Sequence, residues 1–443
     1  MYPEIFDSRL EKLSLKRLSE EVERPLLLKQ LEYVFKKSPF YKKKLQTFKS
    51  AKEAFNHFKL LPFTEKKEII DDQIEFPPLG SNLSVDRKKV IRIHRTSGTT
   101  GRPVFIAMTG NDIEATIRSG ARCFWASGLR PDDVVFHCLN YCMWIGGYTD
   151  HQSLEKTGAS VIPYGVGNSK NLIESIIEVK PTALSCTVSY LKKLELLLEN
   201  DFNMEPANLS LTKGLFGGEG GLQDRQIRKK IEDTWGIKAM DANYGVSDVL
   251  SMFGGECSEQ KGLHFMGQGN LYIELIDPDS GEVFPIEKGV TGEFVLTNLQ
   301  REAQPVIRFR THDMVEILDH NRCDCGRSSF RFKVLGRSDD MIVVKGLNIY
   351  PVAIGGVVSE FLDAMTGEYQ IIVENKQPVD KITVAIEYRD GLSENERGRL
   401  NLAIAKRIKE RFEVNSQIEL VPAGALPRTE GKTKRLVRIE HTL

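Results

Sequence analysis

Residues near position 100 have the types and spacing of an anion-binding loop. Arg95 to Pro103 reads R-T-S-G-T-T-G-R-P and follows the strand-like segment from Val90 to His94. Glycines let the main chain approach a ligand closely, and exposed main-chain N–H groups together with hydroxyl donors can surround a polyphosphate. The candidate donors and glycines are Ser97, Gly98, Thr99, Thr100 and Gly101. No Gly-Lys-Ser/Thr follows, so this is not a Walker loop. Alone, it also fits an ordinary turn between strands.

Three further segments carry residues that suit a nucleotide. Leu215 to Gly221 is a glycine-rich turn after an apolar strand, a place where planar ligands bind. Asn243 to Asp248 offers an aromatic ring and a carboxylate that could hold Mg²⁺, and Arg308 to Asp313 ends in a carboxylate that could accept from a ribose hydroxyl. The candidate residues are Gly218, Glu219, Asn243, Tyr244, Gly245, Asp248 and Asp313. Each segment alone fits a structural role equally well: a tight turn, a core tyrosine or an ion-paired strand.

Four dispersed residues could form a metal site. Cys323 and Cys325 lie in a knuckle-like turn, while Cys257 and His264 lie in a glycine-rich stretch upstream. Three sulfurs and one imidazole make a common closed shell for structural Zn²⁺. The C-x-C spacing is weaker than paired C-x-x-C, so reduced cysteines and a stacked histidine are the alternative.

The elements that must position these residues change character along the chain. The first sixty residues predict amphipathic helices, with Pro39 ending the second. From Val134 to Leu198, short apolar strands alternate with helical patterns, which is typical of parallel βαβ units. After Asp241 the pattern predicts an antiparallel sheet or a distorted barrel. Beyond Gly336 it predicts a small α/β unit with a helix near 394–411 and a last strand at 417–421.

Composition limits the class of protein. The chain has 443 residues, 41% hydrophobic and 28% charged, which suits a globular protein of two or three domains. Its 61 basic and 61 acidic side chains balance, so no nucleic-acid or anionic-membrane partner is expected. A charged N-terminus and seven cysteines favour a cytoplasmic protein with reduced thiols. The oligomeric state is left open, and a homodimer is one arrangement it allows.

The order of six segments resembles the adenylate-forming (acyl-CoA synthetase and adenylation-domain) superfamily, and within it the phenylacetate-CoA ligase family. An ordered set is far more specific than any single motif. The segments are L-P-F-T-E-K at 61–66, R-T-S-G-T-T-G-R-P at 95–103, N-Y-G-V-S-D at 243–248, P-V-I-R-F-R-T-H-D at 305–313, G-R-S-D-D-M-I-V-V-K-G-L-N-I-Y-P at 336–351 and L-P-R-T-E-G-K at 426–432.

The resemblance implies an α/β fold in two parts. Residues 1–336 would form a large adenylation domain of parallel α/β subdomains and a distorted antiparallel β-barrel, and residues 337–443 a small, mobile α+β lid. It also implies a reaction in two steps. A carboxylate and ATP give an acyl-adenylate and pyrophosphate, and a thiol, usually that of coenzyme A, then displaces AMP.

The resemblance also implies roles for residues. The loop at 97–101 would hold the β- and γ-phosphates and Lys432 would be the catalytic cation. Tyr244 would cover the adenine over Gly218 and Glu219, while Asp313 and Arg337 would hold the ribose. The lid would rotate about Asp339 to bring Lys345 and Gly346 toward CoA. The acyl pocket would include Tyr141, Trp144 and Gly147, and the bulk of Trp144 favours a compact aryl or branched acid over a long fatty acid.

Two departures from the superfamily pattern leave alternatives open. Asp248 stands where glutamate is common, so ligation of Mg²⁺ could become water-mediated, and Val104 stands where many superfamily members have lysine. An adenylating enzyme that transfers its acyl group to a carrier protein or an amine is the nearest alternative. A catalytically weakened nucleotide-binding protein is a more distant one.

Overall fold

The computed structural model describes residues 2–96, 102–344, 347–374, 381–427 and 435–439. The chain divides into two compact units. Unit 1 comprises Met1–Gly218 and Glu232–Lys333, and unit 2 comprises Glu219–Ile231 and Val334–Leu443. The sequence prediction had a single cut, at position 337, and did not assign the segment 219–231 to the smaller unit. None of the helices in these described ranges is long and apolar enough to cross a membrane.

The N-terminal residues of unit 1 form short helices, as predicted. Leu27, Leu31 and Val34 recur at helical spacing on α3 and are buried in one apolar cluster. Pro39 follows the end of α3 and begins α4, where its missing N–H costs nothing. The elements are α1 (Ser8–Glu11), α2 (Leu15–Leu18), η1 (Ser19–Glu23), α3 (Arg24–Lys37), α4 (Pro39–Lys44), α5 (Ala51–Asn56), η2 (Phe58–Leu60) and α6 (Lys66–Glu75).

A two-stranded antiparallel ribbon flanks the predicted phosphate loop. After η3 (Arg87–Lys89), β1 (Arg92–Arg95) pairs with β2 (Phe105–Met108), and Arg95 lies opposite Phe105. The loop therefore connects two strands whose register is fixed.

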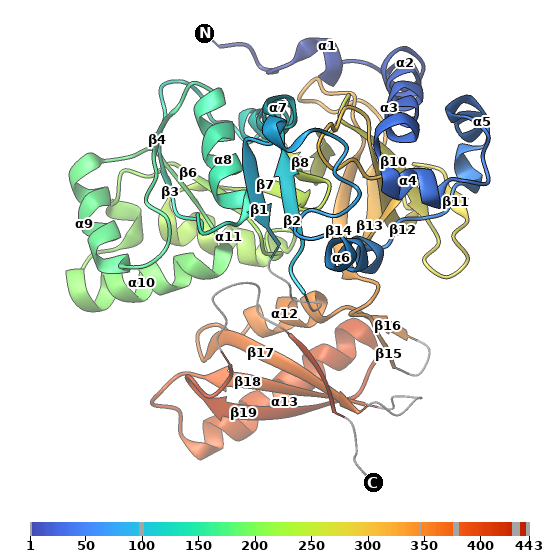
Figure 1. Cartoon of the computed structure of the whole chain (residues 1–443). Coiled ribbons are helices and arrows are strands. Elements are labelled where there is room, and N and C mark those ends of the chain that lie inside the picture. Colours follow the sequence, from blue (N-terminus) through green and yellow to red (C-terminus); the bar gives the residue numbers. More distant parts are fainter. Residues whose placement is uncertain (1, 97–101, 345–346, 375–380, 428–434, 440–443) are drawn as a thin grey trace. The chain divides into compact units, whose positions relative to one another are not determined.

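The predicted βαβ units are confirmed. β3, β4, β5, β6 and β7 pair in parallel, and Figure 1 shows α9 and α10 at the β3–β4 end of this sheet. The elements are α7 (Gly110–Ala126), β3 (Val134–His137), α8 (Ile145–Lys156), β4 (Ser160–Ile162), α9 (Ser169–Val179), β5 (Ala183–Cys186), α10 (Val188–Phe202), η4 (Pro206–Asn208), β6 (Lys213–Gly217), α11 (Arg225–Trp235) and β7 (Lys238–Val246).

The antiparallel strands continue the same sheet through β7, which pairs in parallel with β6 and antiparallel with β8. Among the described strands the order is β11-β10-β12-β13-β14-β9-β8-β7-β6-β5-β3-β4. The parallel and the antiparallel strands thus form one twelve-stranded sheet. The remaining strands are β8 (Leu250–Glu256), β9 (Leu263–Phe265), β10 (Leu271–Ile276), β11 (Val283–Phe284), β12 (Thr291–Asn298), β13 (Phe309–Asp319) and β14 (Arg331–Arg337).

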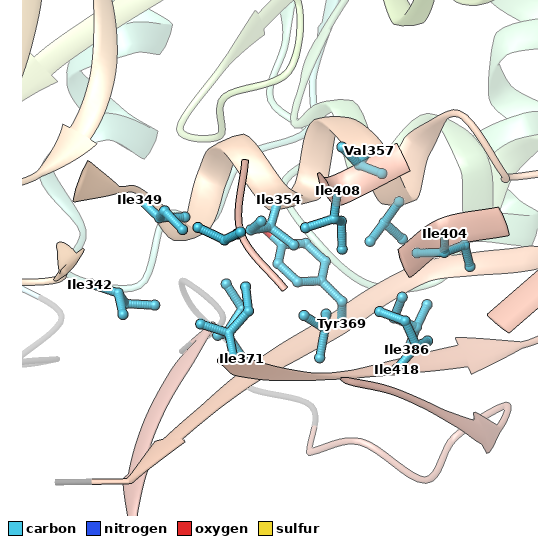
Figure 2. Packing of buried hydrophobic residues seen from close by; sticks show 14 of the residues in the cluster. Ile342, Ile349, Ile354, Val357, Tyr369, Ile371, Ile386, Ile404, Ile408 and Ile418 are labelled. Carbon is cyan, nitrogen blue, oxygen red and sulfur yellow. The ribbon is translucent and has the colours of Figure 1, made fainter. Parts of the chain in front are cut away.

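Unit 2 is built on a four-stranded sheet of order β19-β18-β17-β20. Figure 2 shows how apolar residues of β17 and β18, including Ile371 and Ile386, face those of α12 and α13, including Ile354 and Ile408. The elements are β15 (Ile342–Val344), β16 (Leu347–Ile349), α12 (Pro351–Ser359), β17 (Met365–Glu374), β18 (Ile382–Tyr388), α13 (Glu394–Phe412), β19 (Ser416–Pro422) and β20 (Leu436–Ile439). The prediction that the strand at 417–421 is the last one was wrong, because β20 follows it and pairs in parallel with β17.

Candidate functional site

The strand β7 brings two predicted nucleotide-binding residues together. Tyr244 donates from its hydroxyl to Asp313 Oδ2 at 2.8 Å, although the residues are 69 positions apart. The Tyr244 ring packs edge-on against Phe253 and Phe332, with centroids 5.2 and 5.5 Å away. Two neighbouring rings thus fix the orientation of the tyrosine, which presents its hydroxyl to the carboxylate.

The residues on either side of Tyr244 are fixed by packing. Asn243 donates its amide to Oδ2 of Asp150, a fully buried residue on α8. Burial raises the pKa of Asp150 well above its usual range. A Cβ at Gly245 would collide with the carbonyl oxygen of Ser251. The approach of β8 to β7 is therefore a sufficient reason for glycine at position 245.

Asp248 lies in the turn between β7 and β8 and pairs with a lysine. Lys66 Nζ is 2.9 Å from Asp248 Oδ2, and the side chains are 28% and 11% exposed. Asp248 Oδ1 is buried and has no hydrogen-bond partner among the residues that the structure describes. A free carboxylate oxygen of this kind suits Mg²⁺ or a metal-bound water. One carboxylate oxygen of Asp248 is therefore available to the predicted metal or its water, while Lys66 holds the other oxygen.

Thr96 and Val104 close the base of the phosphate loop. The N–H of Thr96 donates to the carbonyl of Val104, and the N–H of Val104 donates to the Thr96 hydroxyl, both at 2.9 Å. The predicted phosphate-binding residues at 97–101 (Ser97, Gly98, Thr99, Thr100 and Gly101) lie outside the described residues. The two hydrogen bonds between Thr96 and Val104 fix the distance between the two ends of this loop.

The predicted acyl-pocket residues occupy the segment that leads into α8. The Tyr141 hydroxyl lies 3.1 Å from His151 Nδ1, and the Tyr141 ring packs edge-on against the ring of His137. A Cβ at Gly146 would lie 2.8 Å from the Trp144 ring, so the indole folds back over the first turn of α8. A Cβ at Gly147 would collide with the carbonyl oxygen of Asn140, which makes glycine necessary for the backbone to pass.

His137 anchors this segment to the parallel sheet. Its Nε2 is 2.9 Å from the carbonyl oxygen of Gly147 and its Nδ1 is 3.1 Å from the Ser185 hydroxyl. Burial lowers the pKa of His137 to about 4. The ring is therefore neutral near pH 7, donates from Nε2 to the carbonyl and accepts from Ser185.

Folding brings the four predicted metal ligands together. One ligand atom from each of Cys257, His264, Cys323 and Cys325 lies within 4.8 Å of every other. Tetrahedral zinc with Zn–S bonds of about 2.3 Å and a Zn–N bond of about 2.05 Å requires S···S of roughly 3.8 Å and S···N of roughly 3.6 Å. The structure has 3.9 Å between the sulfurs of Cys257 and Cys323 and 3.5 Å from Cys325 Sγ to His264 Nε2.

The surroundings of the cluster also suit a metal. His264 Nδ1 lies 3.1 Å from the Ser329 hydroxyl, which leaves Nε2 as the ligand atom. Arg331 donates to the sulfur of Cys323 at 3.6 Å, so a cation lies close enough to stabilise a thiolate. Hydrogen bonds from Cys257 and from His264 lower the pKa of the Cys325 thiol. The residues therefore fit zinc in number, type and spacing.

Some of the predicted site residues near and beyond position 337 are described by the structure and others are not. Arg337 donates from Nε and Nη2 to the two carboxylate oxygens of Asp339, at 2.8 and 2.6 Å, so the predicted ribose ligand pairs with the predicted hinge residue. Lys345, Gly346 and Lys432 lie outside the described residues. Gly218 and Glu219 fall on opposite sides of the division between the units, and Gly218 has a φ of +79° that favours glycine.

Three residues that contact the predicted site were missed from the sequence. Lys66 lies in L-P-F-T-E-K, a segment used for the resemblance but given no role. Asp150 and His94 had no signal, because their partners, Asn243 and Met143, are 93 and 49 positions away. The burial of these two ionisable residues next to segments predicted to line the site becomes visible only in the folded structure.

Comparisons with known proteins agree with the architecture. Residues 346–438 match the family model for the AMP-binding enzyme C-terminal domain. The chain is 33% identical to phenylacetate-coenzyme A ligase of Aromatoleum evansii, over 85% of this chain and 83% of that protein. It is 32% identical to the Pseudomonas putida enzyme of the same name, over 84% and 82%.

A solved structure has the same fold. The structure of 2-hydroxyisobutyryl-CoA ligase in the postadenylation state, in complex with 2-HIB-AMP, matches with a TM-score of 0.86 and 24% identity, over 99% of this chain and 95% of that one. The sequence identities, the coverage and the ordered motifs agree with one another. The chain therefore belongs to the phenylacetate-coenzyme A ligase family of adenylate-forming enzymes.

Proposed function

We propose that this chain activates a compact aryl or branched carboxylic acid. The enzyme is an AMP-forming acid–thiol ligase: it joins the acid to AMP with release of pyrophosphate and then forms a thioester with coenzyme A. The observation that carries the nucleotide site is the 2.8 Å hydrogen bond from Tyr244 to Asp313. This contact supports the proposal, because it brings the aromatic ring of Tyr244 on β7 next to the carboxylate of Asp313 on β13.

The nucleotide is held by residues from several segments. Tyr244 covers the adenine, with Gly218 and Glu219 beneath it and Asn243 and Gly245 flanking it. Asp313 and Arg337 bind the ribose hydroxyls. The phosphate loop residues Ser97, Gly98, Thr99, Thr100 and Gly101 bind the β- and γ-phosphates, since phosphoryl-group chemistry depends mainly on positioning and charge neutralisation.

Asp248 is the carboxylate that would bind Mg²⁺. Its Oδ1, which has no hydrogen-bond partner among the described residues, would hold Mg²⁺ through a metal-bound water, because aspartate is one methylene shorter than the glutamate common at this position. Mg²⁺, when bound with ATP, neutralises phosphate charge. Lys66 holds Oδ2 and keeps the carboxylate in one orientation.

Lys432 stabilises the negative charge that develops on the α-phosphate and the acyl oxygens. After adenylation, residues 337–443 rotate about Asp339, which takes Lys432 away and brings the strand with Lys345 and Gly346 to the pantetheine. The division of the chain, residues 1–336 and 337–443, follows from this role. The zinc shell of Cys257, His264, Cys323 and Cys325 is structural, and its reduced thiols fit a cytoplasmic enzyme.

The acid binds along Tyr141 to Gly147. Tyr141 and Trp144 border the pocket, and Gly147 allows the backbone to pass close to Asn140. Two relatives are named phenylacetate-coenzyme A ligase, and the structural neighbour was solved with 2-HIB-AMP. Both acids are compact, which agrees with the acid size that we propose from the bulk of Trp144.

The test is acid-dependent pyrophosphate release, measured with phenylacetate, 2-hydroxyisobutyrate, anthranilate, octanoate and palmitate, with and without CoA. We expect release with one of the compact acids, little with palmitate, and conversion to thioester when CoA is added. Release that CoA cannot turn into thioester would instead indicate transfer to a carrier protein or an amine. No acid-dependent release from any compact acid would contradict the proposed activity.

A further inference from the structure

Two residues of strand β1 contact the same main-chain carbonyl oxygen in the acyl segment, which is residues 141–147. The N–H of Arg95 donates to the carbonyl of Met143 at 2.9 Å. His94 Nδ1 lies 3.2 Å from the same oxygen. Since a carbonyl can only accept, the ring of His94 carries its proton on Nδ1. Met143 lies between Tyr141 and Trp144, the two residues that border the proposed acyl pocket.

Two unfavourable features meet at this contact. Met143 has a φ of +56°, in the left-handed region that non-glycine residues rarely adopt. His94 is buried, and within the described part of the chain its Nε2 has no hydrogen-bond partner. Burial also lowers the pKa of His94 to about 4, which keeps the ring neutral and the Nδ1 proton in place near pH 7. Strained backbone and unpaired buried polar atoms tend to persist where function requires the geometry.

A second contact holds β1 against α8. The guanidinium of Arg92 lies 4.5 Å from the centre of the Tyr148 ring. Arg92 and His94 are two positions apart on a strand and therefore face the same side. That side of β1 is thus joined to the acyl segment and to the first turns of α8 by two side chains.

The other end of β1 leads directly to the phosphate loop. Thr96 follows the strand, and its two hydrogen bonds with Val104 fix the ends of the loop. A movement of the Met143 carbonyl can therefore be passed to the ends of the loop through a few covalent bonds and hydrogen bonds. Three residues, His94, Arg95 and Thr96, make up that route.

We propose that the contact between His94 and Met143 couples the acid site to the phosphate loop, so that acid and ATP each raise the affinity of the enzyme for the other. The inference rests on the proposed function, because it uses the assigned acyl and phosphate sites. His94 is a positioning residue: it touches neither substrate and acts through the main chain of Met143. Reciprocity is a thermodynamic requirement of such coupling.

The proposal predicts a measurable ratio. The dissociation constant of α,β-methylene-ATP is measured by calorimetry with and without saturating phenylacetate, or 2-hydroxyisobutyrate if only that acid supports turnover. The wild-type enzyme should bind the analogue about 5-fold or more tightly with acid present, which is the lower range of allosteric couplings. His94→Leu removes one hydrogen bond and should reduce a ratio of about 5 by about 3- to 5-fold, to near one.

Two variants separate coupling from stability. His94→Asn places an amide nitrogen near the position of Nδ1 and should retain most of the ratio. Leu198→Ala opens a cavity in α10, where Leu198 is fully buried, and should lower the melting temperature at least as much as His94→Leu while keeping the ratio. This pattern would support the proposal.

Three results would overturn it: a wild-type ratio of one, a His94→Leu ratio equal to that of wild type, or equal losses in His94→Leu and His94→Asn. Acid-dependent pyrophosphate release is measured on the same samples. Normal release with a ratio of one refutes the coupling alone, whereas absence of release refutes the proposed function.

Discussion

Removing zinc from the Cys257, His264, Cys323 and Cys325 cluster should lower the melting temperature of unit 1. The four candidate ligands lie at the end of β8, on strand β9 and in the turn between β13 and β14, so a zinc ion there would join segments up to 68 positions apart in sequence. The distances already match a tetrahedral shell. Binding free energy should therefore stabilise the folded state directly.

The size of the effect follows from mass action. Free zinc at one hundred times its dissociation constant stabilises the folded state by about 2.7 kcal/mol. Unit 1 has about 320 residues, which gives an unfolding entropy of about 0.7 kcal/mol per degree. The expected decrease in melting temperature is therefore about 4 °C, and about 6 °C at a thousandfold excess.

The assay is differential scanning fluorimetry of the purified protein before and after treatment with a chelator, with metal analysis of the same samples. Cys325→Ser should lose zinc and show the lower melting temperature without chelator. Cys142→Ser is the matched control, because Cys142 is exposed and outside the cluster, and it should retain both properties. Well under one zinc per chain, with a melting temperature that chelation leaves unchanged, would refute the reasoning.

Three further predictions concern stability and nucleotide binding. Burial raises the pKa of Glu23 to about 8 from 4.5, so the stabilising contribution of its protonated form is complete below pH 4.5 and is lost as the pH rises to 8. In urea unfolding, Glu23→Gln should therefore be more stable than wild type by a few kcal/mol at pH 8.5. At pH 4.5 the two proteins should have similar stability. Arg308→Met leaves Glu274 buried without its partner, which lies 3.0 Å away, and should lower the free energy of unfolding by about 3–5 kcal/mol, while adding Glu274→Leu should restore much of it. Equal stability of the single and double variants would contradict that account. Tyr244→Phe keeps the ring but loses the bond to Asp313, so the KM for ATP should rise about 3- to 10-fold with little change in kcat; an unchanged KM would mean that the hydroxyl has no part in nucleotide binding.

Local patterns predicted most of the elements. The strands between Val134 and Leu198 were predicted because each is a short apolar run between turn residues, a signal contained in the segment itself. By contrast, β20 follows the basic residues K-T-K-R and is stabilised by parallel pairing with β17, more than sixty positions earlier. The continuity of the sheet through β7 also depends on pairings that no local pattern reports.

The same distinction applies to the site. Ordered motifs predicted Tyr244 and Asp313, and the spacing of cysteines and histidine predicted a cluster that the fold brings together. The pairing of Lys66 with Asp248 spans 182 positions. Such contacts depend on how distant elements pack, so the sequence could indicate the residue types at the site but not which neighbour each one meets.

The most direct measurement of the central claim is single-turnover mass spectrometry of the enzyme with ATP, Mg²⁺ and an active acid. Without CoA, the wild-type enzyme should accumulate acyl-AMP, and addition of CoA should convert it to acyl-CoA and AMP. Lys432→Ala should lose acyl-AMP formation by at least about 100-fold, while Lys406→Ala, an exposed lysine on α13, should behave as wild type. Absence of acyl-AMP from the wild-type enzyme, or its formation at an unchanged rate in Lys432→Ala, would contradict the account.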